Sequence, residues 1–119
     1  MTRKHSTWIL VLGLTASLGS ANAAGSFTLL GVGTQSCGAW VQAREGRGHF
    51  PAAKQAAMLT WAQGFLSAAV VVTGRDILRD LDPAAMKTWL DNYCQKHPIR
   101  SVWQALGVLV SQLRLKAPQ

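Results

Sequence analysis

Acidic residues are scarce in this chain of 119 residues, which has 5 Asp and Glu against 12 Lys and Arg. Catalysis by paired carboxylates requires two acids that face one cleft. Four of the five acids are expected at helix ends or on polar faces, as caps and solvated charges: Asp76, Asp80, Asp82 and Asp91. The sequence therefore gives no support to carboxylate-based catalysis.

Cysteine and histidine are also few. The two cysteines are Cys37 and Cys94, and the histidines His49 and His97 lie far apart in the sequence. Zinc sites need ligands clustered at short spacings, so we expect no metal. A nucleophile needs a serine or thiol beside a histidine. Ser36, Cys37 and His49 are near in sequence, but the cysteine is expected to be consumed in a disulfide and His49 lies in a glycine-flanked loop.

A phosphate-binding glycine loop is absent as well. The segment Gly31-Val32-Gly33 lacks both the third glycine and the helix-opening context of such a loop. The sequence has no internal repeat and no low-complexity tract. We therefore expect a protein that has no cofactor and is not an enzyme.

The first 23 residues have the three-part layout of a secretory signal peptide. Positive charge at Arg3 and Lys4 precedes an uncharged apolar run over 8–18, and small residues follow, ending in Ala21-Asn22-Ala23. This order predicts cleavage after residue 23 and export to the periplasm. Residues 24–119 are then one small mature domain.

A membrane anchor is the alternative interpretation of the amino-terminal run. A spanning helix needs roughly 20 apolar residues, and Gly19 and Ser20 end this run too early. The other apolar stretch is interrupted by four residues: Thr60, Gln63, Gly64 and Ser67. We therefore expect no stable membrane insertion after signal cleavage.

Net charge narrows the choice of partners. Removal of Arg3 and Lys4 leaves an excess of five positive charges. Nucleic-acid binding favours Lys and Arg gathered on one face, often with aromatic stacking partners, whereas here the charges are spread singly. An acidic protein partner or an anionic envelope surface fits this charge better than nucleic acid does.

The two cysteines predict a covalent link. In an oxidising compartment an even pair is most simply a disulfide, and the alternative is two free thiols. A Cys37–Cys94 bond closes a loop of about 58 residues and contributes roughly 4 kcal/mol in the chain-entropy model. For a domain this small, that amount is a large share of the total stability.

Residues 24–33 are predicted to form an extended arm or a short edge segment. The first two helices follow this segment. Thr34 or Ser36 is a candidate cap for a helix that continues to about Arg44, with Trp40 and Val41 facing inward. Two glycines in 45–49 end it. Pro51 then starts a helix that ends at Gly74.

Apolar spacing within 52–73 predicts a helix that lies centrally and is covered on more than one side. Two overlapping stripes at spacings of three and four carry this prediction. One comprises Met58, Ala62, Phe65, Ala69 and Val72, and the other comprises Trp61, Phe65, Ala68 and Val72.

Two further helices complete the predicted fold. Residues 75–81 form a connector with room for one helical turn, and Asp82-Pro83 starts a helix that ends near Lys96. Its inward residues are Met86, Leu90 and Tyr93, with Trp89 beside them. The last helix is predicted over 98–115, with an apolar stripe at Val102, Leu106, Leu109 and Leu113. The expected fold is an all-α bundle of three to four helices stapled by Cys37 and Cys94.

Tryptophan is frequent for this length. Trp40, Trp61 and Trp89 fall on or beside apolar stripes, so packing explains them better than a ligand box does. Trp103 sits off the main stripe of the last helix, where an exposed ring is suited to contact a partner.

Three segments resemble small exported proteobacterial proteins of the HdeA-like family: 37–40 (CGAW), 61–67 (WAQGFLS) and 89–98 (WLDNYCQKHP). The resemblance extends over about 36–113. One branch of this family comprises Rap/Tai-type immunity proteins, which neutralise amidase toxins of type VI secretion. The other comprises the Hde acid-stress chaperones, which unfold partly in acid and hold other periplasmic proteins.

The sequence therefore predicts a non-enzymatic periplasmic protein-binding module. The resemblance implies that it acts as an immunity-type inhibitor of a secreted toxin. The alternative is a periplasmic stress chaperone of the holdase type, which exposes apolar surface on partial unfolding.

Overall fold

The computed structural model describes residues 26–118, and this part of the chain is all-helical. Its elements are a 3-10 turn η1 (Val32–Thr34), α1 (Cys37–Arg44), α2 (Pro51–Thr73), α3 (Pro83–Lys96) and α4 (Val102–Lys116). The all-α prediction is confirmed, with four α-helices in the described part. The predicted signal peptide lies outside the described residues.

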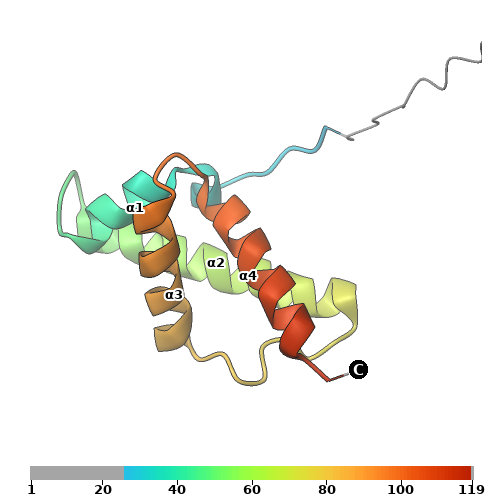
Figure 1. Cartoon of the computed structure of the whole chain (residues 1–119). Coiled ribbons are helices and arrows are strands. Elements are labelled where there is room, and N and C mark those ends of the chain that lie inside the picture. Colours follow the sequence, from blue (N-terminus) through green and yellow to red (C-terminus); the bar gives the residue numbers. More distant parts are fainter. Residues whose placement is uncertain (1–25, 119) are drawn as a thin grey trace, which may run out of the picture.

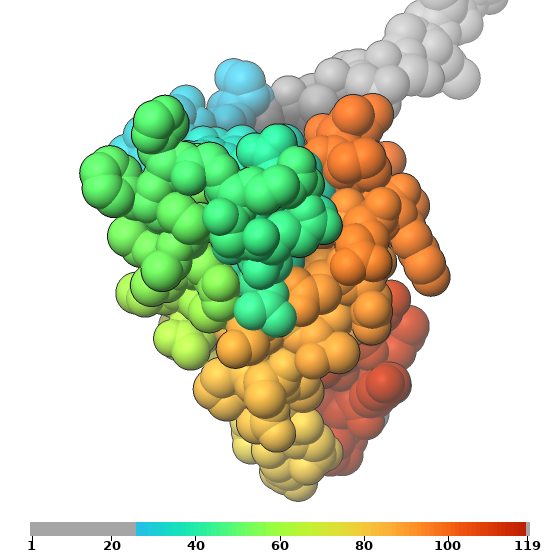
Figure 2. Space-filling view, turned by 90° about the vertical axis from the view of Figure 1, so that its left-hand side faces the viewer, coloured from blue at the N-terminus to red at the C-terminus, as the bar shows by residue number. Residues whose placement is uncertain are grey.

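Helices α3 and α4 lie in front of α2 and diverge toward the connector of residues 74–82 (Figure 1). They are closest at their other ends, where residues 97–101 join them near α1. Seen from the side, the molecule tapers toward the connector (Figure 2).

Side-chain caps fix where α1 and α3 begin. The Ser36 hydroxyl accepts a hydrogen bond from the Ala39 N–H at 3.1 Å, and Asp82 accepts one from the Ala85 N–H at 2.6 Å. Both bonds satisfy backbone donors that have no partner within the helix. The predicted starts at Ser36 and at Asp82-Pro83 are therefore confirmed.

Helix α4 begins at Val102, so its predicted start at Pro98 is wrong. Ser101 and Gln104 form a capping box, in which each side chain accepts a hydrogen bond from the backbone N–H of the other residue. Residues 98–100 form a turn in front of it, and Ile99 is exposed. The capping box overrides the helix-starting tendency of the proline.

The bounds of α2 match the sequence prediction, because Pro51 begins it and Gly74 follows it in the left-handed conformation with φ 63°. Its environment differs from the prediction. Of its side chains, only Met58, Ala62 and Leu66 are buried, and Val72, predicted to face inward, is 87% exposed. Helices α1 and α4 and the turn η1 cover one side of α2. The last turn of α2 extends beyond them.

Length and composition alone make α2 apolar enough to cross a bilayer, and it is the one such helix among residues 26–118. The polar residues within α2 therefore do not exclude such a helix, contrary to the sequence prediction. In the bundle, α2 packs its buried residues against the neighbouring helices and leaves its opposite face exposed. The expected cover on more than one side is therefore wrong.

The core is built from all four helices and contains the disulfide. Cys37 and Cys94 are both fully buried, with their sulfurs 2.13 Å apart and their Cα atoms 4.7 Å apart. The predicted bond between them is confirmed. The large buried side chains around it are Trp40, Met58, Leu66, Leu90, Val102 and Leu106.

The segment before α1 is held by Trp61. The Trp61 indole N–H donates a hydrogen bond to the Leu30 carbonyl at 2.9 Å, and its ring lies against Gly33. A Cβ on Gly33 would lie 2.2 Å from this ring. The glycines of this segment therefore permit a close backbone approach to an aromatic ring.

Asp91 joins α1 to α3, so its predicted role as a solvated charge is wrong. It accepts a hydrogen bond from the buried Trp40 indole at 2.9 Å and forms an ion pair with Arg44 at 2.8 Å. The hydrogen bond to Asp91 raises the pKa of the Arg44 guanidinium above its ordinary value. As the pH rises through that raised pKa, the guanidinium loses its charge and the contribution of this charge to stability is lost.

Candidate functional site

The divergence of α3 and α4 opens a cavity of about 460 Å³ between these helices and the connector. We call this cavity the α3–α4 groove. Its apolar lining includes Ile77, Leu81, Trp89, Leu109 and Leu113. Its polar lining comprises Asp76, Arg79, Asp80, Gln112 and Lys116. An apolar cavity with a few polar groups, in this size range, is the usual form of a binding site.

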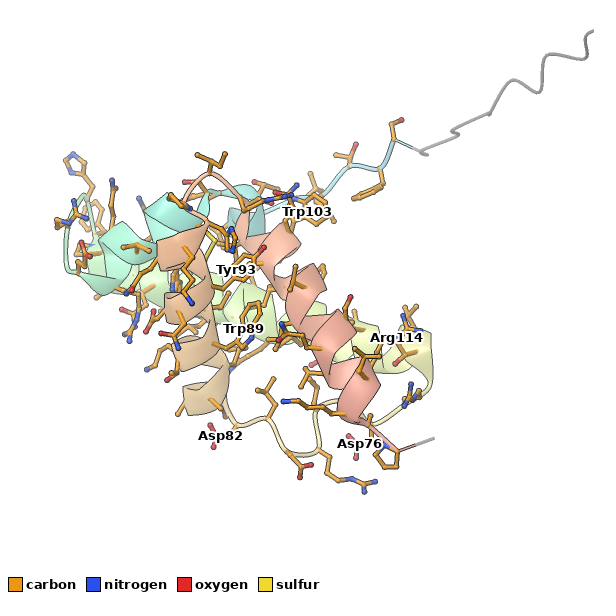
Figure 3. The ribbon with its side chains drawn as sticks, in the orientation of Figure 1. Asp76, Asp82, Trp89, Tyr93, Trp103 and Arg114 are labelled. Carbon is orange, nitrogen blue, oxygen red and sulfur yellow. A yellow bond between two sulfur atoms is a disulfide. The ribbon has the colours of Figure 1, made fainter. Side chains whose placement is uncertain are left out.

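Trp89 forms one wall of the groove and is fixed from two directions. Its indole N–H donates a hydrogen bond to the Gln112 side-chain oxygen on α4 at 3.0 Å. Its ring stacks on Tyr93, with centroids 5.0 Å apart and planes inclined by 11°. Figure 3 shows both rings on the side of α3 that faces α4. These two contacts therefore hold the half-buried Trp89 ring in place.

The aromatic row on α3 continues to the end of the helix. His97 lies one turn beyond Tyr93, and the two ring centroids are 4.4 Å apart. Tyr93 was predicted to face the core, but it is only half-buried, and the buried position in this turn belongs to Cys94. Trp89, Tyr93 and His97 therefore present a row of partly exposed rings.

Charges surround the connector side of the groove. Asp76 pairs with Arg79 at 3.4 Å, and both side chains are 62% exposed, so this pair contributes little to stability. Asp80 and Lys116 have no ion-pair partner in the described part of the chain. Exposed groups of both signs are suited to contact a polar rim of a partner.

Trp103 lies outside the groove, at the beginning of α4 (Figure 3). The Phe27 ring packs edge-on against its indole, with centroids 5.6 Å apart and planes at 79°. The Trp103 side chain is therefore half-buried. Its role as a partner contact remains a prediction.

The structure does not assemble a nucleophilic set from the residues considered in the sequence. The Ser36 hydroxyl caps α1, and Cys37 is in the disulfide. His49 is exposed in the loop between α1 and α2. Within residues 26–118, no group of three or more His, Cys, Asp or Glu side chains is placed to hold a metal ion.

From the sequence, Trp89 was interpreted as a packing residue, and its partners in the groove were missed. Gln112 lies 23 residues away on another helix, so no local pattern connects the two side chains. Asp76 and Asp80 line the same groove, although each was interpreted only as a cap or a solvated charge. The spacing of four between Trp89, Tyr93 and His97 is the one visible sign of this face.

Comparison with known proteins found no match to a family model, a curated protein or a solved structure. The fold and the groove define the class of protein, a small disulfide-linked helical bundle with an aromatic-walled groove.

Proposed function

We propose that this chain is an exported, non-enzymatic module that binds another protein through the α3–α4 groove. The observation that carries the proposal is the half-exposed Trp89 ring, held by Gln112 and Tyr93 at the wall of a cavity of about 460 Å³. Aromatic anchors of this kind supply much of the energy in protein interfaces. A fixed ring also lowers the entropy lost on binding.

The charge of the chain supports an acidic partner. Three of its basic residues form ion pairs in the structure, and they are Arg44, Arg47 and Arg79. Seven others in the described part have no carboxylate within 4.0 Å: Lys54, Arg75, Lys87, Lys96, Arg100, Arg114 and Lys116. Such an excess accelerates association with an acidic protein.

The resemblance to HdeA-like proteins supports a partner among periplasmic proteins. Its immunity branch suits this chain better than its chaperone branch, because acid activation requires native carboxylate interactions that protonation breaks. Asp91 is the single acid in the described part that holds two helices together. We therefore propose an immunity-type inhibitor of a secreted toxin as the specific role.

The experiment is a capture from periplasmic extract with the oxidised mature protein, followed by titration calorimetry with the recovered partner. Trp89→Ala should weaken binding by about 30-fold, as truncation of an interface anchor does. Gln95→Ala is the matched control, because Gln95 is exposed on the same helix and does not line the groove. Equal affinities of the two variants, or no stoichiometric partner, would refute the groove as the binding site.

A holdase is the second candidate, and one observation favours it. Large apolar side chains are exposed in the folded state, including Val71, Val72 and Leu115. A holdase opens in acid and suppresses client aggregation, whereas an inhibitor stays folded. Dye binding and client aggregation measured from neutral to acidic pH therefore separate the two functions.

A further inference from the structure

A second surface lies on the other side of α4 from Trp89, at the narrow end of the molecule. A hollow of about 310 Å³ is lined there by Arg75, Ser111, Arg114 and Leu115. We call this surface, together with the last turn of α2, the basic tip. Figure 3 places Arg114 on the side of α4 away from Trp89. The basic tip and the α3–α4 groove are therefore separate.

Large apolar side chains are exposed at the basic tip. Leu115 is 88% exposed, and Val71 and Val72 in the last turn of α2 are 82% and 87% exposed. Val71 lies four residues before Arg75 in the sequence. Clustered exposed apolar groups beside cations are a feature of surfaces that meet a partner or a membrane.

Arg114 is exposed at the basic tip, whereas Arg75 is half-buried. Neither Arg75 nor Arg114 has a carboxylate within 4.0 Å among residues 26–118. Arg75 donates from Nη2 to the backbone carbonyl of Ala117, which ties the connector to the end of α4. Cations at helix C-termini also complement the helix dipole, but this effect does not explain the exposed apolar side chains beside them.

The outer face of α2 continues the surface without a charged group. It carries small side chains, and its exposed positions include Ala53, Ala57, Thr60, Gly64, Ser67 and Val71. Nothing lies within 4 Å of a Cβ built on Gly64, so this face is open. A long uncharged face that ends in cations can lie against a bilayer without burying a charge.

We propose that the basic tip binds the surface of an anionic membrane. Arg114 contacts lipid phosphate groups, and Val71, Val72 and Leu115 enter the boundary between headgroups and acyl chains. Interfacial binding of this kind combines apolar burial with attraction to anionic lipids. This attachment holds the protein at the membrane and leaves the α3–α4 groove free for its partner.

The test is cosedimentation of the oxidised mature protein with vesicles. Vesicles of phosphatidylglycerol and phosphatidylcholine in equal parts should retain the protein, and vesicles of phosphatidylcholine alone should not. Arg114→Gln should reduce the partition coefficient about fivefold, as expected for loss of one cation near an anionic surface. Leu115→Ser should reduce it further, because an apolar group no longer enters the interface.

Arg100→Gln is the matched control, because it removes the same charge from an exposed turn at the opposite end of α4. An effect of Arg100→Gln as large as that of Arg114→Gln would show that net charge alone drives binding and would overturn the proposal. Absence of binding to the anionic vesicles would overturn it as well. A third result would also overturn the proposal: NMR shifts at the basic tip with inorganic phosphate but no shifts with the vesicles. Such a result would identify a site for a free anion.

Discussion

The buried indole nitrogen of Trp40 and a carboxylate oxygen of Asp91 lie 2.9 Å apart, and the hydrogen bond between them crosses from α1 to α3. Arg44 donates to both oxygens of the same carboxylate from Nε, at 2.9 and 3.1 Å. The guanidinium carbon of Arg44 also lies 5.8 Å from the centre of the Trp40 ring. One carboxylate thus satisfies a buried donor and fixes a cation beside it.

Asp91→Ala should lower the free energy of unfolding by about 2 kcal/mol, because it leaves the Trp40 indole N–H buried without an acceptor. Asp91→Asn keeps an oxygen for the indole and loses the ion pair, so its cost should be about half as large. Urea denaturation of the oxidised protein measures both. Equal losses for the two variants would show that the indole bond contributes little.

Gly33→Ala and Gly64→Ala should change stability in opposite directions. The first places a Cβ 2.2 Å from the Trp61 ring and should cost about 2 kcal/mol through overpacking. The second adds a methyl group in open space in the middle of α2 and should gain roughly 0.5–1 kcal/mol through helix propensity. Thermal unfolding of both variants tests the pair, and a neutral Gly33→Ala would contradict the described packing of Trp61.

Loss of the disulfide should be the most costly single change to the fold. The double variant Cys37→Ala with Cys94→Ala should unfold with about 4 kcal/mol less free energy than the oxidised protein, because its unfolded chain is no longer closed into a loop. Mass analysis under non-reducing conditions confirms the bond in the starting material. If the reduced and oxidised proteins had the same urea midpoint, the bond would have no stabilising role.

Ser101→Ala should cost about 1 kcal/mol, because it removes one half of the capping box at the beginning of α4. Ser67→Ala is the control, since Ser67 is exposed within α2 and its hydroxyl donates only to the Gln63 carbonyl of its own helix. Circular dichroism during urea titration measures both variants. A loss for Ser67→Ala equal to that for Ser101→Ala would indicate a general effect of serine rather than a cap.

Local signals in the sequence were enough to set most helix ends. Pro51 and Gly74 bound α2, and Asp82-Pro83 starts α3, as predicted. These signals act through the backbone of one or two residues, so they do not depend on the rest of the fold. The start of α4 was predicted wrongly because two starting signals, Pro98 and Ser101, lie three residues apart. The prediction chose the proline, whereas the helix begins after the serine cap.

The groove was not predicted from the sequence. The aromatic spacing on α3 was visible, but the cavity depends on how far α3 and α4 diverge in space. The same is true of Asp91, whose two partners lie on α1, 47 and 51 residues away. Pairings over such distances in sequence leave no periodic pattern.

By itself the sequence determined the helical class, the bounds of most helices and the pairing of its two cysteines. The tertiary structure alone decided which parts of each apolar stripe are covered, and Val72 at the end of α2 is exposed for that reason. Periodicity specifies a face of a helix, whereas burial depends on where neighbouring helices cross that face and where they end. The groove and the basic tip both lie at places where that cover stops.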